Sequence, residues 1–139
     1  MKRLSLVGAL LGAATLSLAQ RVFLDGREIV FDDVRPQMVN GRLMVPIRGI
    51  FEQMGIAVEW DAQREVVTAR KAPDLVELEV NSRVARINGQ EAVLEVAPFH
   101  HRGRTLVPLR LIAQATGANV TYRDGDVHIQ TSQRTAGRS

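Results

Sequence analysis

One stretch of this chain occurs twice, and the repetition constrains the fold more than any local pattern. Residues 41–58, GRLMVPIRGIFEQMGIAV, return 62 positions later as residues 103–120, GRTLVPLRLIAQATGANV. Eight aligned positions are identical, and the alignment needs no gap. Repetition at a fixed interval indicates that one supersecondary unit is built more than once. The sequence therefore predicts two copies of one unit.

Glycine, arginine, proline and aromatic residues mark the repeat. They are Gly41, Arg42, Pro46, Arg48, Gly55 and Trp60 in the first copy, and Gly103, Arg104, Pro108, Arg110, Gly117 and Tyr122 in the second. A proline is tolerated in the first turn of a helix, where its missing N–H costs nothing. A glycine tolerates the left-handed conformation that ends a helix. We expect these marker residues to be structural.

Turn signals and apolar patterns place strands on both sides of each expected helix. Asp-Gly and Asn-Gly pairs, which suit tight hairpin turns, occur within residues 22–31, 84–93 and 119–130. A further hairpin is expected over residues 57–69, and residues 31–40 are expected to be a loop. The pattern predicts an α+β fold of two strand–strand–helix–strand–strand (ββαββ) repeats, about 22–70 and 75–131, with antiparallel strands packed against one helix per repeat.

Each expected helix has one apolar face at the helical spacing. The faces are Ile47, Ile50, Phe51 and Met54 in the first copy, and Leu109, Ile112, Ala113 and Thr116 in the second. The aromatic residues Phe23, Phe31, Phe51, Phe99, Trp60 and Tyr122 mostly fall at positions typical of a core. Residues 74–80 alternate acidic and apolar side chains, which is typical of a half-buried strand. Half of the chain is too small for a good core, so we expect both copies to share one.

The two ends indicate export and a solvated tail. Lys2 and Arg3 precede an apolar run over residues 4–18, and small side chains at Ser17 and Ala19 predict signal-peptide cleavage after residue 19. The run is shorter than the ~20 residues that span a bilayer, so stable membrane insertion is not expected after cleavage. Residues 132–139 have no apolar pattern and are expected to be disordered. The chain contains no cysteine, so its stability must come from its core.

The repeated Gly-Arg, Val-Pro-x-Arg and Val-x-Trp series (residues 39–61 and 103–122) resembles the copper amine oxidase N-terminal-like domain, also called a stalk domain. The resemblance covers roughly residues 22–131. The second copy departs from it, with Tyr122 in place of Trp60 and Arg123 in place of Asp61. The resemblance implies a small antiparallel sheet wrapped against a helix. It also implies an accessory, non-catalytic module, separate from any copper and quinone centre.

Arg48 and Arg110 each stand two residues after a proline, and two interpretations remain open. The guanidinium forks could bind an anion or a carboxylate. They could instead form structural ion pairs, since Glu52 lies four residues after Arg48 and Asp61 ends the next strand. The second copy has Gln114 and Arg123 there, so its pairing must differ. Repetition of both arginines favours the structural role.

No catalytic or metal-binding set is evident. His100 and His101 are neighbours whose side chains point in opposite directions on an extended chain, and His128 is distant in sequence. Asp124-Gly125-Asp126 offers too few oxygens for calcium. The acid pairs Asp32/Asp33 and Glu59/Asp61 could suggest glycoside hydrolysis, but such pairs are common by chance. We therefore expect no catalytic residues, no metal and no cofactor.

The charge balance argues against a nucleic-acid ligand. Of 18 basic residues, two belong to the expected signal, which leaves 16 against 15 acidic residues. A nucleic-acid binder usually carries a basic stripe, and here the signs are interleaved. The expected function is a secreted, non-catalytic binding or spacer module of the bacterial cell envelope, with an envelope protein or cell-wall component as partner. The alternatives are an inhibitor or adaptor of an exported enzyme that acts through a strand edge, and a small secreted metal-binding protein.

Overall fold

A computed structural model describes residues 21–131 of the chain. The expected signal peptide over residues 1–19 and the expected tail over residues 132–139 lie outside the described residues. The first repeat contains β1 (Val22–Leu24), β2 (Arg27–Glu28), β3 (Gln37–Val39), β4 (Arg42–Pro46), α2 (Ile47–Phe51), the 3-10 turn η1 (Glu52–Met54), β5 (Ala57–Asp61) and β6 (Val66–Lys71). The second contains β8 (Val84–Ile87), β9 (Gln90–Val93), β10 (Phe99–His101), β11 (Arg104–Pro108), α3 (Leu109–Thr116), β12 (Asn119–Arg123) and β13 (Asp126–Gln130). Strand β7 (Asp74–Glu79) joins the two repeats.

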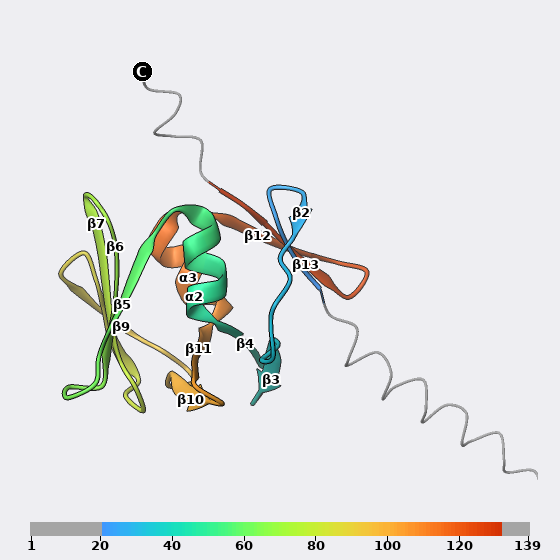
Figure 1. Ribbon diagram of the computed structural model, residues 1–139. Coiled ribbons are helices and arrows are strands. Elements are labelled where there is room, and N and C mark those ends of the chain that lie inside the picture. The colour runs from blue at the N-terminus through green and yellow to red at the C-terminus, as the bar shows by residue number, and fades with distance from the viewer. Residues whose placement is uncertain (1–20, 132–139) are drawn as a thin grey trace, which may run out of the picture.

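The strands form three sheets around the two helices. The terminal sheet has the order β12-β13-β1-β2, the central sheet β10-β11-β4-β3, and the large sheet β5-β6-β7-β8-β9. Figure 1 shows both helices between the large sheet on the left and the terminal sheet on the right, with the central sheet below them. The fold is therefore α+β with a predominance of strands, as the sequence predicts.

The two repeats meet at the middle of the central sheet. Strands β4 and β11 pair antiparallel, and Val45 lies directly opposite Val107, its own repeat equivalent. The neighbouring pairs are Leu106 with Pro46 and Pro108 with Met44. Because Leu106 is the repeat equivalent of Met44 and Pro108 that of Pro46, these two pairs are equivalent to each other. Antiparallel pairing of a residue with its equivalent is locally two-fold symmetric. An approximate two-fold axis thus passes between Val45 and Val107.

Each outer sheet combines hairpins from both repeats. In the terminal sheet, β1 of the first repeat pairs parallel with β13 of the second. The equivalent strands of the large sheet, β8 and β6, do not pair directly, because β7 lies between them and pairs antiparallel with both. β7 therefore breaks the two-fold relationship, and neither repeat completes a sheet by itself.

The expected ββαββ order is not confirmed, and the expectation of purely antiparallel strands is wrong for the β1–β13 pair. A second hairpin precedes each helix, formed by β3–β4 and by β10–β11. Its outer strands, β3 and β10, have only three residues each, and β3 falls within the sequence expected to be loop. The turns are Asn40-Gly41 and Arg102-Gly103, where all four residues have positive φ angles. The Arg-Gly turn lacks the asparagine or aspartate that usually announces such a hairpin.

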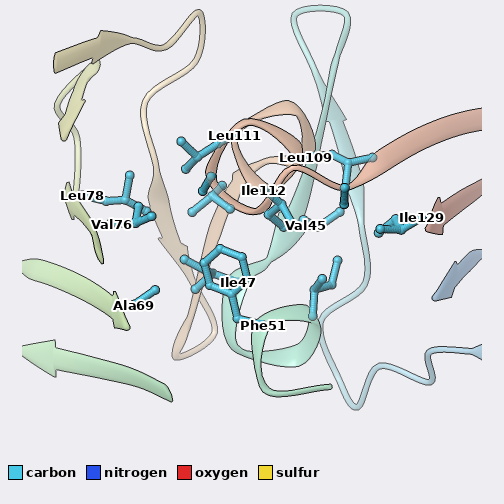
Figure 2. Close-up of a cluster of buried hydrophobic side chains, with 14 of the residues drawn as sticks. Val45, Ile47, Phe51, Ala69, Val76, Leu78, Leu109, Leu111, Ile112 and Ile129 are labelled. Carbon is cyan, nitrogen blue, oxygen red and sulfur yellow. The ribbon is translucent and has the colours of Figure 1, made fainter. Parts of the chain in front are cut away.

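The helices pack on a core shared by both repeats. Ile50 and Ile112 are equivalent and fully buried, which confirms the core positions expected for them. α2 continues into η1 and ends at Gly55, whose φ is 79°. Figure 2 shows side chains from α2, α3 and the flanking sheets converging in this cluster.

The buried face of α3 is broader than expected. Leu111 and Ala115 are buried, whereas Ala113 and Thr116 are only half-buried. The physical reason is β7: α3 lies against this inserted strand, and in Figure 2 Leu111 lies on the side of Val76 and Leu78. The helix therefore has sheet on a side where its sequence alone predicts solvent.

The expected core location of the aromatic residues holds for Phe51, in part for Phe31 and Phe99, which pack against core clusters, and is wrong for Trp60 and Tyr122. Phe51 is fully buried, whereas Phe23, Phe31 and Phe99 are half-buried. Trp60 and Tyr122 are 40% and 61% exposed. These two rings lie at equivalent positions near the ends of β5 and β12, at the surface.

Candidate functional site: two equivalent hollows

The marker residues of the repeat gather around two surface hollows. The Trp60 hollow, of about 180 Å³, is bordered by Pro46, Ile47, Arg48, Val58, Trp60 and Arg104. The Tyr122 hollow, of about 390 Å³, is bordered by Pro108, Leu109, Arg110, Val120, Tyr122 and Arg42. Each residue of the first set is the repeat equivalent of the residue in the same place in the second set. The two hollows are therefore related by the same two-fold axis as the repeats.

Each hollow combines residues of both repeats. In the Tyr122 hollow, Arg110 and Tyr122 come from the second repeat and Arg42 from the first. In the Trp60 hollow, Arg48 and Trp60 come from the first repeat and Arg104 from the second. The tight turns before β4 and β11 carry Arg42 and Arg104 to these positions. The hollows exist only because the repeats are joined.

The arginine and tryptophan side chains around the Trp60 hollow already have partners within the protein. Arg48 Nη1 donates a hydrogen bond of 2.8 Å to Glu52 Oε2. Arg104 lies 3.5 Å from Asp32 and 3.7 Å from Asp33. The Trp60 ring meets His100 edge to face, with ring centroids 4.7 Å apart. Both guanidinium groups therefore have carboxylate partners within the protein.

The Tyr122 hollow is more open and more cationic. Arg42 pairs with Glu95, but Arg110 takes part in none of the ion pairs formed within residues 21–131. Three acidic positions of the first repeat are neutral or basic in the second. The substitutions, first repeat to second, are Glu52 to Gln114, Glu59 to Thr121 and Asp61 to Arg123.

A smaller hollow of about 200 Å³ adjoins the Tyr122 hollow. Arg42, Pro108 and Arg110 line both, and the smaller one also contains Leu94 and Glu95. The two hollows therefore lie on either side of the same two arginines. This smaller hollow also contains Val93, which is 73% exposed and offers apolar surface to a ligand larger than one hollow.

Arg42 and Arg104 link the repeats through equivalent ion pairs. Arg42 of the first repeat reaches Glu95 of the second, and Arg104 of the second reaches Asp32 and Asp33 of the first. The acids occupy corresponding places after the first hairpin of each repeat. All of these side chains are substantially exposed, so each pair contributes at most about 1 kcal/mol.

The largest hollow, of about 550 Å³, lies elsewhere, at the C-terminal ends of both helices. Its Lys71 ammonium donates to the Met54 carbonyl over 3.4 Å. Its Asp25 carboxylate accepts hydrogen bonds from the amide and the hydroxyl of Thr131. The marker residues of the repeat do not line it. Its charged groups therefore serve contacts within the fold, and the Tyr122 hollow is the stronger candidate for recognition.

His100 and His101 are neighbours on β10, whereas His128 lies apart from them in the terminal sheet. His100 contacts Thr105 and Trp60 in one region, whereas the His128 ring stacks on Phe23 in the terminal sheet at 4.8 Å. No group of three histidine, aspartate or glutamate side chains within residues 21–131 is placed to hold a metal ion.

Asp32, Asp33 and Asp61, three of the acids singled out in the sequence, have partners within the protein. Asp32 and Asp33 pair with Arg104. Asp61 Oδ1 accepts the amides of Gln63 and Arg64 in the β5–β6 turn, each at 3.1 Å.

Asp126 fixes the start of the terminal sheet. Its carboxylate accepts hydrogen bonds from the Arg21 guanidinium at 2.8 Å and from the Arg21 amide at 3.1 Å. The guanidinium hydrogen bond is the main cause that lowers the pKa of Asp126 below its ordinary value, and it likewise raises the pKa of Arg21. Burial of Asp126 opposes this shift without reversing it. Asp126, the second acid of the Asp124-Gly125-Asp126 turn, is therefore part of an ion pair that anchors the terminal sheet.

Sequence reasoning did not find the partners of Arg42 and Arg104 or the hollows. The partners lie 53 and 72 residues away along the chain. The sequence nevertheless carries a signal for these ion pairs. Acidic residues follow the first hairpin of both repeats, and the interval between the two acidic positions is nearly the same as the interval between Arg42 and Arg104.

Comparison with known proteins agrees with the resemblance noted in the sequence. The chain matches the family described as Copper amine oxidase N-terminal domain over residues 23–131, which is nearly all of the described fold. No curated protein matches the chain. Among the described residues, no helix is long and apolar enough to cross a membrane. The match spans most of the chain, and the chain therefore belongs to the copper amine oxidase N-terminal domain family.

Proposed function

We propose that this protein is an exported, non-catalytic module of the bacterial cell envelope that binds an envelope component or spaces other parts of the envelope. The observation that carries the proposal is the extent of the family match. Residues 23–131 match one N-terminal domain, and that range contains both helices and, apart from Val22 at the start of β1, all strands of the three sheets. The whole described fold is thus accounted for by a module that is accessory in character.

Export is supported by the sequence at the start of the chain. Lys2 and Arg3, the apolar run over residues 4–18 and the small residues before position 20 form a signal-peptide pattern. Fractionation of the native host, followed by N-terminal analysis, tests this part. The proposal requires Gln20 at the N-terminus of protein recovered outside the cytoplasm. An intact Met1 on protein retained in the cytoplasm would contradict it.

Activity and copper binding are tested with the purified protein. Copper is titrated while bound metal is measured, and peroxide is followed in the presence of amines. The proposal predicts no peroxide and no stoichiometric copper. One tightly held copper per chain, lost when His100, His101 and His128 are replaced, would establish the metal-binding alternative instead.

A specific feature of the large sheet favours the adaptor alternative. β9 is an edge strand of that sheet, and Val93 on it is 73% exposed. An exposed edge presents unpaired backbone groups to an incoming strand. Affinity capture from an envelope extract, with Val93→Lys as a matched variant, separates the two functions. Loss of one specific protein partner in this variant supports the adaptor, whereas capture that is insensitive to it supports the binding or spacer module.

A further inference from the structure

We propose that the Tyr122 hollow binds the free carboxylate end of a short peptide whose last side chains are small and apolar. The inference deepens the proposed envelope function, since the stem peptides of the bacterial cell wall end in this way. It is argued from the charge, the lining and the asymmetry of the two equivalent hollows.

The charge at the hollow suits one carboxylate. Arg42 and Arg110 both line it, and Glu95 pairs with Arg42. Arg110 keeps its guanidinium outside the ion pairs of residues 21–131. A guanidinium fork binds a carboxylate through two parallel hydrogen bonds, which gives both strength and orientation. Arg110 is thus the cation available to a ligand.

The remaining lining suits a small apolar body. Ala113 and Val120 provide half-buried aliphatic surface, the buried Leu43 and Pro108 lie behind it, and the exposed Tyr122 ring borders it. A volume of about 390 Å³ falls within the range of ~300–1,000 Å³ in which proteins hold small ligands. A carboxylate with one or two methyl-sized side chains fits both the charge and the lining.

The Trp60 hollow serves as an internal comparison. It has the same residue types in the same places, yet its two arginines pair with Glu52 and with Asp32 and Asp33. Its volume is about half as large, and His100 packs against its aromatic ring. In this first hollow both arginines are therefore already paired with the protein's own carboxylates. The second keeps the scaffold and lacks the acid that neutralises its helix arginine, because Gln114 stands where Glu52 stands.

The test measures binding of acetyl-D-alanyl-D-alanine to the purified protein by calorimetry and by amide chemical shifts. Acetyl-L-alanyl-L-alanine and the C-terminal amide of each peptide are measured alongside. We expect saturable binding of the acid and none of the amide, with shifts at α3 and β12. Arg110→Gln should weaken binding at least about tenfold, since hydrogen bonds to charged groups carry most of the affinity. Glu95→Gln should strengthen it, because the repelling carboxylate is removed.

Arg48→Gln is the matched control, since it makes the same change in the equivalent hollow and should leave binding unchanged. Thermal unfolding of all variants shows whether a loss of binding reflects unfolding, and Arg110→Lys should keep part of the affinity. Equal binding of acid and amide, or equal losses in Arg48→Gln and Arg110→Gln, would overturn the site.

The two enantiomers distinguish the source of the ligand. Preference for the D peptide supports the cell wall, whereas preference for the L peptide overturns the cell-wall source. Failure of the site leaves export and envelope retention intact. Failure of the envelope function appears instead as cytoplasmic protein whose hollow still binds carboxylates.

Discussion

Phe31 lies against Gly49, so closely that a Cβ on Gly49 would stand 3.2 Å from the Phe31 ring. The equivalent position in the second helix is Leu111, and the residue that corresponds to Phe31 is Leu94. Leu94 and Leu111 line a common hollow. The repeats therefore fill the same space with one large ring beside a glycine in the first case, and with two leucines in the second.

The first prediction concerns this exchange of volume. Replacing glycine by alanine inside a helix normally stabilises by about 1 kcal/mol. In Gly49→Ala the new methyl group meets the Phe31 ring, so we expect the gain to be lost or reversed. In the Phe31→Leu background the ring is absent and the gain should return. Chemical denaturation of the four proteins in the cycle measures the coupling, and equal effects of Gly49→Ala in both backgrounds would show that Phe31 imposes no constraint.

The second prediction concerns the shared core. Ile50 and Ile112 are each 0% exposed. Replacing either by alanine should lower the free energy of unfolding by roughly 2–5 kcal/mol. Because the core is common to both repeats, each variant should still unfold in one transition. Loss of structure confined to the mutated repeat, seen by hydrogen exchange, would contradict a common core.

The third prediction concerns Arg48. The sequence leaves open whether Arg48 binds an anion or forms a structural ion pair, and removing a buried pair would cost ~1–3 kcal/mol. The structure places Arg48 and Glu52 about half exposed at i and i+4, where such pairs contribute about 0.3–0.5 kcal/mol. Arg48→Gln should therefore change stability only slightly, and less at high salt. A loss of several kcal/mol in thermal unfolding would show that Arg48 does more than pair with Glu52.

The fourth prediction concerns acid. Arg21 lowers the pKa of Asp126 in the folded protein below its unfolded value of about 3.9. The folded state thus favours the carboxylate, and this stabilisation is fully present above the unfolded pKa. It disappears as the pH falls through the lowered folded pKa. Asp126→Asn should reduce the Tm at pH 7, and the difference from the unmodified protein should shrink toward pH 2. Asp124→Asn, two residues away in the exposed turn, is the control. A Tm difference that is independent of pH would assign the effect to something other than this charge.

Local chemistry made much of the fold predictable. Asp25-Gly26, Asn88-Gly89 and Asp124-Gly125 all form the expected turns with positive φ angles. Helix α3 starts directly after Pro108, which occupies the extended N-cap position rather than the expected first turn, and it stops at Gly117, whose φ is 78°. Each of these signals acts within a few residues, so the sequence displays it directly.

The rest depends on contacts distant in sequence. The parallel pairing of β1 with β13 joins the two ends of the described chain. The packing of α3 on β7 likewise joins segments that are distant in sequence, whereas β6, β7 and β8 pair as consecutive strands. An alternating strand such as Val76 and Leu78 on β7 reveals that one face is buried, but not what covers it. The exposure of Trp60 and Tyr122 was missed for the same reason.

The candidate site was only half visible in the sequence. Arg48, Arg110, Trp60 and Tyr122 were recognised as repeat equivalents, but their meeting with Arg42 and Arg104 of the opposite repeat was not. The difference between Glu52 and Gln114 was also visible. The consequence of this difference is that Arg48 is paired and Arg110 is available to a ligand. This consequence can be seen only in the geometry of the two hollows.

The central claim is that the two repeats exist as one interlocked unit, in which each supplies hairpins and arginines to the other. The most direct measurement is circular dichroism and NMR of two fragments, residues 20–70 and 71–131, separately and mixed. Each fragment alone should be largely unfolded, because both outer sheets and both hollows require the other half. Mixing should restore a 1:1 complex with the spectrum of the intact chain. A fragment that folds cooperatively by itself, with no change on mixing, would show that the repeats are independent.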